Sequence, residues 1–362
     1  MKLTINTNQL QNLVTKAIKG ASESKLLPMT SLMSIDYDGN GTLSLTTTDM
    51  TNYLTVSAID ICTSGAELHV VVLADNFAKL VSKMTSESID IDFFEDTFTL
   101  SGGKSNYKLE LPLDVDGSLI KMQAPEVKGE SKQTIKLTSI KNILNTAKAS
   151  LATSFSIPCY TAYYIGDEVL STDTHKICCI KEKILDKPAL IRADTMDLLD
   201  IAESDLTCVI SDNAIKFETS DGTFSLSTKV FDGLEVYSIN AINNLVDLDF
   251  KSECVLYKND LLQALDRLAL FVDKNDRNVI NIAFHKDKLV LTNKAQAGVE
   301  EIDYASTTKA KDFECVIDIE LLISQVKATA DERFTLYYGL DNCIKIVNDA
   351  KDIIQIISLF GE

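Results

Sequence analysis

The chain has 362 residues, which exceeds one typical domain and predicts two or three. Hydrophobic residues make up 45% of it and charged residues 24%, a composition that excludes disordered and collagen-like classes. The net charge of −18 excludes a protein that grips nucleic acid with its whole surface. The first residues show no basic segment followed by an apolar run, and no stretch approaches the length of a membrane helix, so we expect a cytoplasmic protein.

The first predicted element is an amphipathic helix over residues 6–18, in which Leu10, Leu13 and Val14 begin an apolar stripe with helical spacing. A hairpin follows over 35–49, with a glycine-rich turn of the kind that tight reversals prefer. A second helix is predicted over 74–85. Alternating residues from 88 onward, such as Ile89 and Ile91, then predict paired strands.

The same order of helix, strands, helix and strands occurs twice more along the chain. Helices are predicted over 136–151 and 193–204, and again over 255–270 and 318–329. Ile140 and Leu261 repeat the place of Leu10, each roughly one domain length further on. Linkers are expected at 124–132 and between 237 and 254. We therefore predict three α+β domains at 1–127, 128–250 and 251–362, each with two helices packed on antiparallel sheets.

Lysines mark the polar faces of the predicted helices. On a chain this acidic, a basic stripe would suit non-specific contact with phosphates, although solvated lysines explain the same pattern. The stripe in domain 1 consists of Lys16, Lys19, Lys79 and Lys83. Domain 2 is less regular, because Lys141 and Lys148 only flank its polar face, and its second helix exposes Asp197, Asp200 and Glu203.

The sequence contains few candidates for catalytic or metal-binding residues. The eight cysteines are scattered and have mostly apolar neighbours, which favours buried free thiols over a metal site or disulfides. Asp173 and His175 could form an acid–base dyad, but no nucleophile or metal set accompanies them. We predict no catalytic residue, no metal, no cofactor and no enzymatic activity, with an Asp173/His175 hydrolase as a remote alternative.

With the repeat in place, the chain resembles the bacterial DNA polymerase III β subunit, the processivity clamp, essentially from end to end. The resemblance rests on MKLTIN, LLPMTSLMSID, LSLTTTDMTNYL and SGGKSNYKLELP in domain 1, LSTDTHKICCI in domain 2, and LLQALDRLALF and AGVEEIDY in domain 3. It implies three DNA-clamp domains and a head-to-tail homodimeric ring around duplex DNA, which tethers DNA polymerase and other replication or repair proteins. An acidic exterior with lysines inside the hole would permit sliding.

The resemblance also implies roles for individual residues. By similarity, Lys25 lies on a loop that touches DNA and joins the lysines above. A cleft for a short hydrophobic peptide of the polymerase or clamp loader would use Thr172, Thr174, His175, Lys176, Ile177, Asp318, Leu321, Leu359 and Phe360. The dimer contact would use Tyr107, Leu109, Leu270 and Phe271, which spacing alone would assign to strands and core.

Departures from the family pattern concentrate at the predicted cleft. Thr174 stands where the family has Gly, Lys176 stands where it has Arg, and a Phe-Pro turn is replaced around 234–238. The C-terminus reads IISLFGE instead of ending in Met-Pro. These changes predict an altered partner specificity and suggest a phage or mobile-element origin. They also keep open a clamp-like scaffold that no longer encircles DNA.

The segment QIISLF, residues 355–360, itself resembles the clamp-binding peptides of polymerases. We interpret it as the last strand, because a buried strand explains the apolar run. A tail that docks into the chain's own cleft is the alternative hypothesis.

Overall fold

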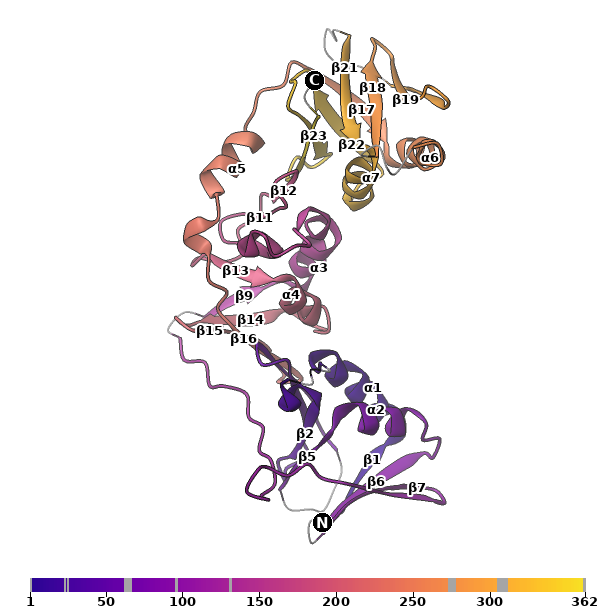
Figure 1. Cartoon of the computed structure of the whole chain (residues 1–362). Helices are drawn as coiled ribbons and strands as arrows, with labels where there is room; N and C mark the ends of the chain where they lie inside the picture. The colour runs from indigo at the N-terminus through magenta and orange to yellow at the C-terminus, as the bar shows by residue number, and fades with distance from the viewer. Residues whose placement is uncertain are drawn as a thin grey trace. The chain divides into compact units, whose positions relative to one another are not determined.

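The computed structural model describes residues 2–22, 24, 26–61, 67–94, 97–129, 132–272, 278–304 and 312–360. Two compact units divide the chain (Figure 1). Unit 1 consists of Met1–Leu137 and Asp194–Val230, and unit 2 consists of Thr138–Ala193 and Phe231–Glu362. Each unit holds one four-stranded and one eight-stranded antiparallel sheet. The three predicted domain ranges cut the chain elsewhere and stay a prediction.

Unit 1 begins with α1 (Thr7–Ala17), which contacts α2 (Ala74–Ser82). The four-stranded sheet has the order β1 (Lys2–Asn6), β6 (Ser88–Phe94), β7 (Thr97–Gly102), β8 (Ser105–Leu109). The eight-stranded sheet has the order β5 (Leu68–Leu73), β2 (Leu32–Tyr37), β3 (Leu43–Thr48), β4 (Asn52–Ala58), β16 (Phe224–Lys229), β15 (Ala214–Thr219), β14 (Leu206–Ile210), β9 (Lys132–Ile135). Also in this unit are α4 (Ala193–Leu199) and the 3₁₀ turns η1 (Ile18–Gly20) and η2 (Pro28–Ser31).

Unit 2 contains α3 (Leu137–Thr146), α5 (Ile239–Val246), α6 (Lys258–Ala269) and α7 (Ile319–Ala328). Its four-stranded sheet has the order β20 (Val299–Asp303), β19 (Lys288–Asn293), β18 (Val279–Phe284), β21 (Phe313–Asp318). The eight-stranded sheet has the order β13 (Ala189–Arg192), β10 (Ala162–Ile165), β11 (Val169–Thr172), β12 (Lys176–Ile180), β24 (Ile353–Ser358), β23 (Cys343–Asn348), β22 (Arg333–Tyr338), β17 (Ser252–Tyr257). Short 3₁₀ turns are η3 (Lys148–Ser150), η4 (Pro158–Thr161) and η5 (Leu234–Val236).

The predicted threefold repeat is confirmed by strand order. The first strand and the last three strands of each repeat form one half-sheet: β1-β6-β7-β8, β9-β14-β15-β16 and β17-β22-β23-β24. The middle four strands form the other: β5-β2-β3-β4, β13-β10-β11-β12 and β21-β18-β19-β20. Each eight-stranded sheet joins half-sheets of consecutive repeats, through β4–β16 in unit 1 and β12–β24 in unit 2. The two halves of the middle repeat therefore belong to different units.

Local sequence explains where the helices begin and what they bury. The Asn6 side chain caps α1 by accepting the N–H groups of Asn8 (3.0 Å) and Gln9 (3.3 Å). Leu10 on α1 and Leu261 on α6 are completely buried, as the apolar stripes predict. The predicted helix over 193–204 is too long. It ends at Leu199, because Ile201 and Ala202 bond to carbonyls only three residues back. Helix α5 was not predicted.

The cysteines are packed rather than paired in the part of the chain that the structure describes. Cys159, Cys178, Cys179, Cys208, Cys254 and Cys343 are buried and Cys315 is half-buried, while Cys62 lies outside the described residues. Burial raises the pKa of the Cys178, Cys208 and Cys315 thiols to about 12. Over the described residues there is no group of three His, Cys, Asp or Glu side chains that could hold a metal. No helix among them is long and apolar enough to cross a membrane.

Candidate functional site

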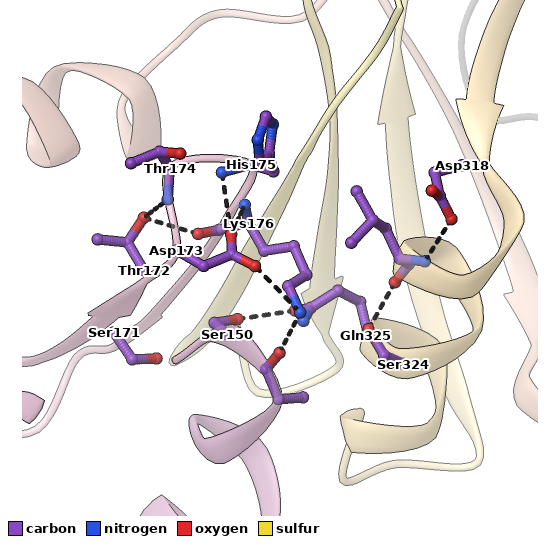
Figure 2. A network of polar contacts seen from close by, with 12 residues as sticks. Ser150, Ser171, Thr172, Asp173, Thr174, His175, Lys176, Asp318, Ser324 and Gln325 are labelled. Carbon is purple, nitrogen blue, oxygen red and sulfur yellow. Dashed lines mark hydrogen bonds and ion pairs between the residues drawn. The ribbon is translucent and has the colours of Figure 1, made fainter. Parts of the chain in front are cut away.

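The predicted peptide-cleft residues of domain 2 lie on the turn between β11 and β12 (Figure 2). The buried Thr172 hydroxyl donates to the Lys176 carbonyl (2.8 Å) and accepts the Thr174 N–H (3.1 Å). The Asp173 carboxylate accepts the N–H groups of His175 (2.9 Å) and Lys176 (2.7 Å) through Oδ1. His175 is exposed, and Ile177 is buried opposite Ile356. The turn thus presents His175 outward and Ile177 to the core.

Thr174 adopts a left-handed backbone conformation, with φ of +80°. This region costs a β-branched residue more than it costs glycine, and glycine is the residue the family resemblance leads one to expect here. The bonds from Thr172 and Asp173 hold the conformation in place. Thr174 therefore adds an exposed side chain beside His175.

Lys176 points inward and its side chain is only 11% exposed. Its ammonium donates to the carbonyl oxygen of Ala149 in η3 (2.6 Å) and lies 3.3 Å from Asp173 Oδ2. The neighbouring Ser171 hydroxyl donates to the Ala147 carbonyl (2.7 Å). These two carbonyls follow the C-terminus of helix α3, where the helix dipole favours cations. In this structure Lys176 therefore fastens the turn to η3.

Helix α7 carries the predicted cleft residues of domain 3. Asp318 caps it by accepting the N–H groups of Glu320 (2.8 Å) and Leu321 (3.1 Å), and Leu321 is half-buried against the core of unit 2. Further along α7, the buried Gln325 side chain accepts the Ser150 hydroxyl of η3 (3.1 Å). It also accepts the amide of Gln355 in β24 (3.1 Å). Sequence reasoning missed this polar network, which joins η3, α7 and β24.

The segment QIISLF is mostly strand, which confirms its interpretation as the last strand. Gln355–Ser358 belong to β24, which lies between β12 and β23 in the sheet, and the Ser358 N–H donates to the His175 carbonyl (2.9 Å). A tail docked as a separate peptide is therefore contradicted. Leu359 is half-buried, and Phe360 bridges to Val316 with 37% of its surface exposed.

An apolar cluster adjoins the turn. Its members include Leu170, Ile177, Tyr237 and Ile242, with Leu234 and Ile239 packed against it. The Tyr237 hydroxyl donates to the Leu170 carbonyl (3.2 Å), and burial raises the Tyr237 pKa. Sequence reasoning noted only that a Phe-Pro turn is replaced here. The apolar spacing of 239–246 was the available signal for α5.

The predicted DNA-facing lysines are not all equivalent. Lys19, Lys83 and Lys141 are exposed and make no ion pair with a described residue, and Lys148 is exposed on η3. Lys79 pairs with Asp75 in the same helix (2.6 Å). Lys16 is largely covered and pairs with Glu203 (2.7 Å), one of the acidic residues that break the basic pattern. Lys25 lies outside the described residues.

The predicted dimer residues lie at or beside the two four-stranded sheets. Tyr107 and Leu109 belong to β8, with Tyr107 44% exposed and Leu109 half-buried. Leu270 and Phe271 follow α6 and are 81% and 56% exposed. Phe271 approaches Gly298, which directly precedes β20. The Phe271 carbonyl accepts a hydrogen bond from the Asn293 side-chain amide (2.8 Å).

Comparison with known proteins identifies the class first. Over 100% of the chain, the structure matches the DNA polymerase sliding clamp from Bacillus subtilis with a TM-score of 0.88, at 18% identity and 99% coverage of that chain. The β subunit of DNA polymerase from Streptococcus pyogenes matches with a TM-score of 0.88, at 16% identity and 100% coverage of both chains. The fold is thus the three-domain clamp fold, and the predicted fold class is confirmed.

The sequence comparisons agree. Residues 1–116 match the family model of the DNA polymerase III beta subunit, N-terminal domain. The beta sliding clamp of Bacillus subtilis (strain 168) is 22% identical over a region that covers 78% of this chain and 78% of that protein. The chain is thus similar in sequence to a bacterial beta sliding clamp over most of its length, as its motifs predict.

Proposed function

We propose that the protein is a DNA sliding clamp: a homodimeric ring that encircles duplex DNA and tethers a polymerase and other replication or repair proteins. In this role it needs no cofactor and has no enzymatic activity of its own. The clamp fold supports the proposal, and the observation that carries it is the state of two sheet edges. These edges are β8 in unit 1 and β20 in unit 2.

The internal repeat shows what β8 and β20 lack. In the first two repeats, one edge strand of the middle half-sheet pairs with the final strand of the next repeat: β4 pairs with β16, and β12 pairs with β24. The equivalent edge strand of the third repeat is β20, and the final strand of the first repeat is β8. The strands left over from this scheme are β20 and β8. Within the described residues, each of them pairs with one neighbour only. A second copy of the chain would supply both missing partners, since unpaired edges are templates for strand pairing and two-fold dimers are self-complementary.

The chemistry of the two edges is complementary. Strand β20 carries Asp303 together with Glu300 and Glu301, which pair with Arg267 (2.6 Å) and Lys288 (3.1 Å) of their own unit. Strand β8 and its turn carry Lys104 and Lys108. Exposed Tyr107 and Phe271 add apolar area beside these charges. Opposite charges would favour β8–β20 pairing over pairing of like edges, and the aromatic side chains would anchor it.

Non-specific DNA contact would fall to the lysines of the helices, with Lys25 added by similarity. Such contacts are mobile because they release counterions without reading bases. The chain's net charge of −18 would discourage attachment of DNA to the outside of a ring. The peptide of a polymerase or loader would bind at the His175 turn, Asp318, Leu321 and the Leu359–Phe360 end.

Solution mass tests ring closure directly. Light scattering should give twice 39.9 kDa for the wild type and about half of that for Phe271→Glu, because a carboxylate would be buried at the joint. Phe155→Glu is the matched control, since Phe155 is similarly exposed but belongs to no strand and is distant in sequence from β8 and β20. A wild type that stays monomeric on DNA would contradict the ring.

DNA retention tests the lysine assignment. A ring should stay on closed circular duplex during gel filtration and leave when the circle is cut. Lys16→Glu with Lys79→Glu should reduce association while leaving the dimer mass unchanged, and Lys183→Glu should change neither. Undiminished association of the double variant would reject these two contacts.

The second candidate is a clamp-like scaffold that does not encircle DNA. The ion pair between Lys16 and Glu203 favours the scaffold, because it neutralises a lysine that would otherwise bind a DNA phosphate. A dimer that shows no topological retention on circular DNA would support the scaffold over the clamp.

A further inference from the structure

Lys176 differs from the other predicted cleft residues because its charged end lies inside the protein. Both of its ammonium contacts, to Ala149 and Asp173, belong to unit 2 itself. A side chain that is 11% exposed offers little surface to a peptide. Lys176 would therefore affect peptide binding indirectly, through its contacts with Asp173 and Ala149.

Those groups determine the shape of the His175 turn. Asp173 uses Oδ1 for the N–H groups of His175 and Lys176, and Oδ2 faces the Lys176 ammonium. Charge-assisted bonds of this kind are stronger than neutral ones. They support Thr174 at φ +80°, a conformation that costs a β-branched threonine more than it costs glycine.

The carbonyl at the other end is equally dependent on Lys176. Ala149 lies in η3, between Lys148 and the fully buried Ser150, whose hydroxyl bonds to Gln325 of α7. The turn is held from the opposite side by β24, through the bond from Ser358 N–H to the His175 carbonyl. Figure 2 shows the Lys176 side chain running from the turn toward Ser150 and Gln325. Removal of the ammonium would leave the Asp173 carboxylate and the Ala149 carbonyl without their shared partner.

We propose that Lys176 is a positioning residue of the peptide cleft, which fixes Thr174 and His175 in the binding geometry by bridging Asp173 to η3. This inference rests on the proposed function, because it presumes that the His175 turn receives a partner peptide. Pre-organisation of this kind improves affinity by lowering the cost of ordering the site on binding.

The test uses a synthetic fluorescent peptide of sequence QIISLF and the full-length protein. Lys176→Met keeps most of the apolar stem and removes the ammonium, and it should weaken binding about tenfold. The double variant Lys176→Met/Thr174→Gly should recover to within about threefold of wild type, because glycine adopts φ +80° without the bridge. Lys183→Met, at a surface lysine with two exposed ion pairs, is the control and should bind like wild type.

The rescue separates positioning from contact. A double variant as weak as Lys176→Met would overturn the proposal, because Lys176 would then contact the peptide itself. Equal binding by Lys176→Met and wild type would overturn it as well. If Lys176→Met does not fold, Asp173→Asn keeps the Oδ1 acceptor and removes the charge on the other side of the bridge, and a loss rescued by Thr174→Gly is again the supporting result.

Failure of the wider function gives a different pattern. A wild type that forms the dimer and stays on circular DNA, yet does not bind QIISLF, would overturn the role of Lys176 and leave the clamp intact. A rescued loss of peptide binding in a protein that never stays on circular DNA would support the positioning role and reject the ring.

Discussion

The turn between β3 and β4 in unit 1 and the turn between β11 and β12 in unit 2 are built by the same bonds. In the first, the Thr48 hydroxyl accepts the Met50 N–H (2.9 Å), and Asp49 Oδ1 accepts the Thr51 and Asn52 N–H groups (2.8 and 2.6 Å). Met50 has a φ of +74°, close to the +80° of Thr174. The backbone of the His175 turn therefore belongs to the repeat, and the cleft uses a shape that the fold already makes.

The two turns differ in the side chains that follow the left-handed residue. Unit 1 has Asn52, whose short amide donates to Asp49 in its own turn (2.9 Å) and accepts the Thr195 hydroxyl (2.8 Å). Unit 2 has Lys176, which is long enough to reach both Asp173 and Ala149. Unit 2 also places an exposed His175 where unit 1 has Thr51. The comparison separates what the repeat requires from what the candidate cleft adds.

The largest expected effect comes from substitutions in the core of each unit. They test whether the two units that carry the turns unfold separately. Leu10→Ala and Leu261→Ala remove equivalent buried side chains from α1 and α6, and each should cost about 2–5 kcal/mol of unfolding free energy. As the urea concentration rises, alkylation should label Cys208 first in Leu10→Ala and Cys178 first in Leu261→Ala. Both thiols are buried, and their pKa values near 12 keep them protonated and slow to react in the folded protein at neutral pH. Simultaneous exposure in both variants would show a single cooperative unit.

The next effect concerns the hydroxyls that tie each turn's strand to the preceding helix. Thr47→Val removes the hydroxyl that donates to the Ala17 carbonyl, and Ser171→Ala removes the one that donates to Ala147, which keeps the Ser150 N–H (3.1 Å). Each should cost about 1–1.5 kcal/mol, because a buried hydrogen bond is lost. Thermal unfolding measures the loss. Ser57→Ala, at a half-buried hydroxyl that pairs only with Ser44 among the described residues, is the control and should lose less.

Exchange between the turns gives a smaller effect. Lys176→Asn gives unit 2 the chemistry of unit 1, so the new amide should still bond Asp173, and only the bond to Ala149 should be lost. We expect about 1 kcal/mol of destabilisation, less than for Lys176→Met. Amide hydrogen exchange should remain slow at His175 and Lys176. Fast exchange there would show that the asparagine cannot replace lysine and that the two turns are less alike than their bonds indicate.

The smallest effect is the conformational cost of the left-handed residue. Thr174→Gly should change stability by no more than about 1 kcal/mol and should be more favourable than Met50→Gly, because a β-branched residue fits φ +80° least well. Differential melting temperatures of the two variants measure the difference. A clear destabilisation by Thr174→Gly alone would mean that the threonine side chain makes a contact that stabilises the turn.

Motifs and periodicity predicted a large part of this protein. The apolar stripes around Leu10, Ile140 and Leu261 located one helix of each repeat, and together with the turn residues they gave the α+β class. Periodicity could not place the end of α4, because the apolar residues Ile201 and Ala202 continue to be buried after the helix has stopped. It also missed α5, since a helix of 8 residues carries too few turns for a strong pattern.

The sequence by itself determined the repeat, the acidic charge, the buried thiols and the resemblance of LSTDTHKICCI to a clamp segment. Only the tertiary structure decided that Lys176 points inward, that Glu203 pairs with Lys16, and that QIISLF is an interior strand. It also showed that β8 and β20 are sheet edges that lack the inter-repeat pairing seen at β4–β16 and β12–β24 among the described residues. The reason is physical: periodicity records which face of an element is buried, whereas ion pairs, long-range bonds and sheet edges depend on which segments meet after folding.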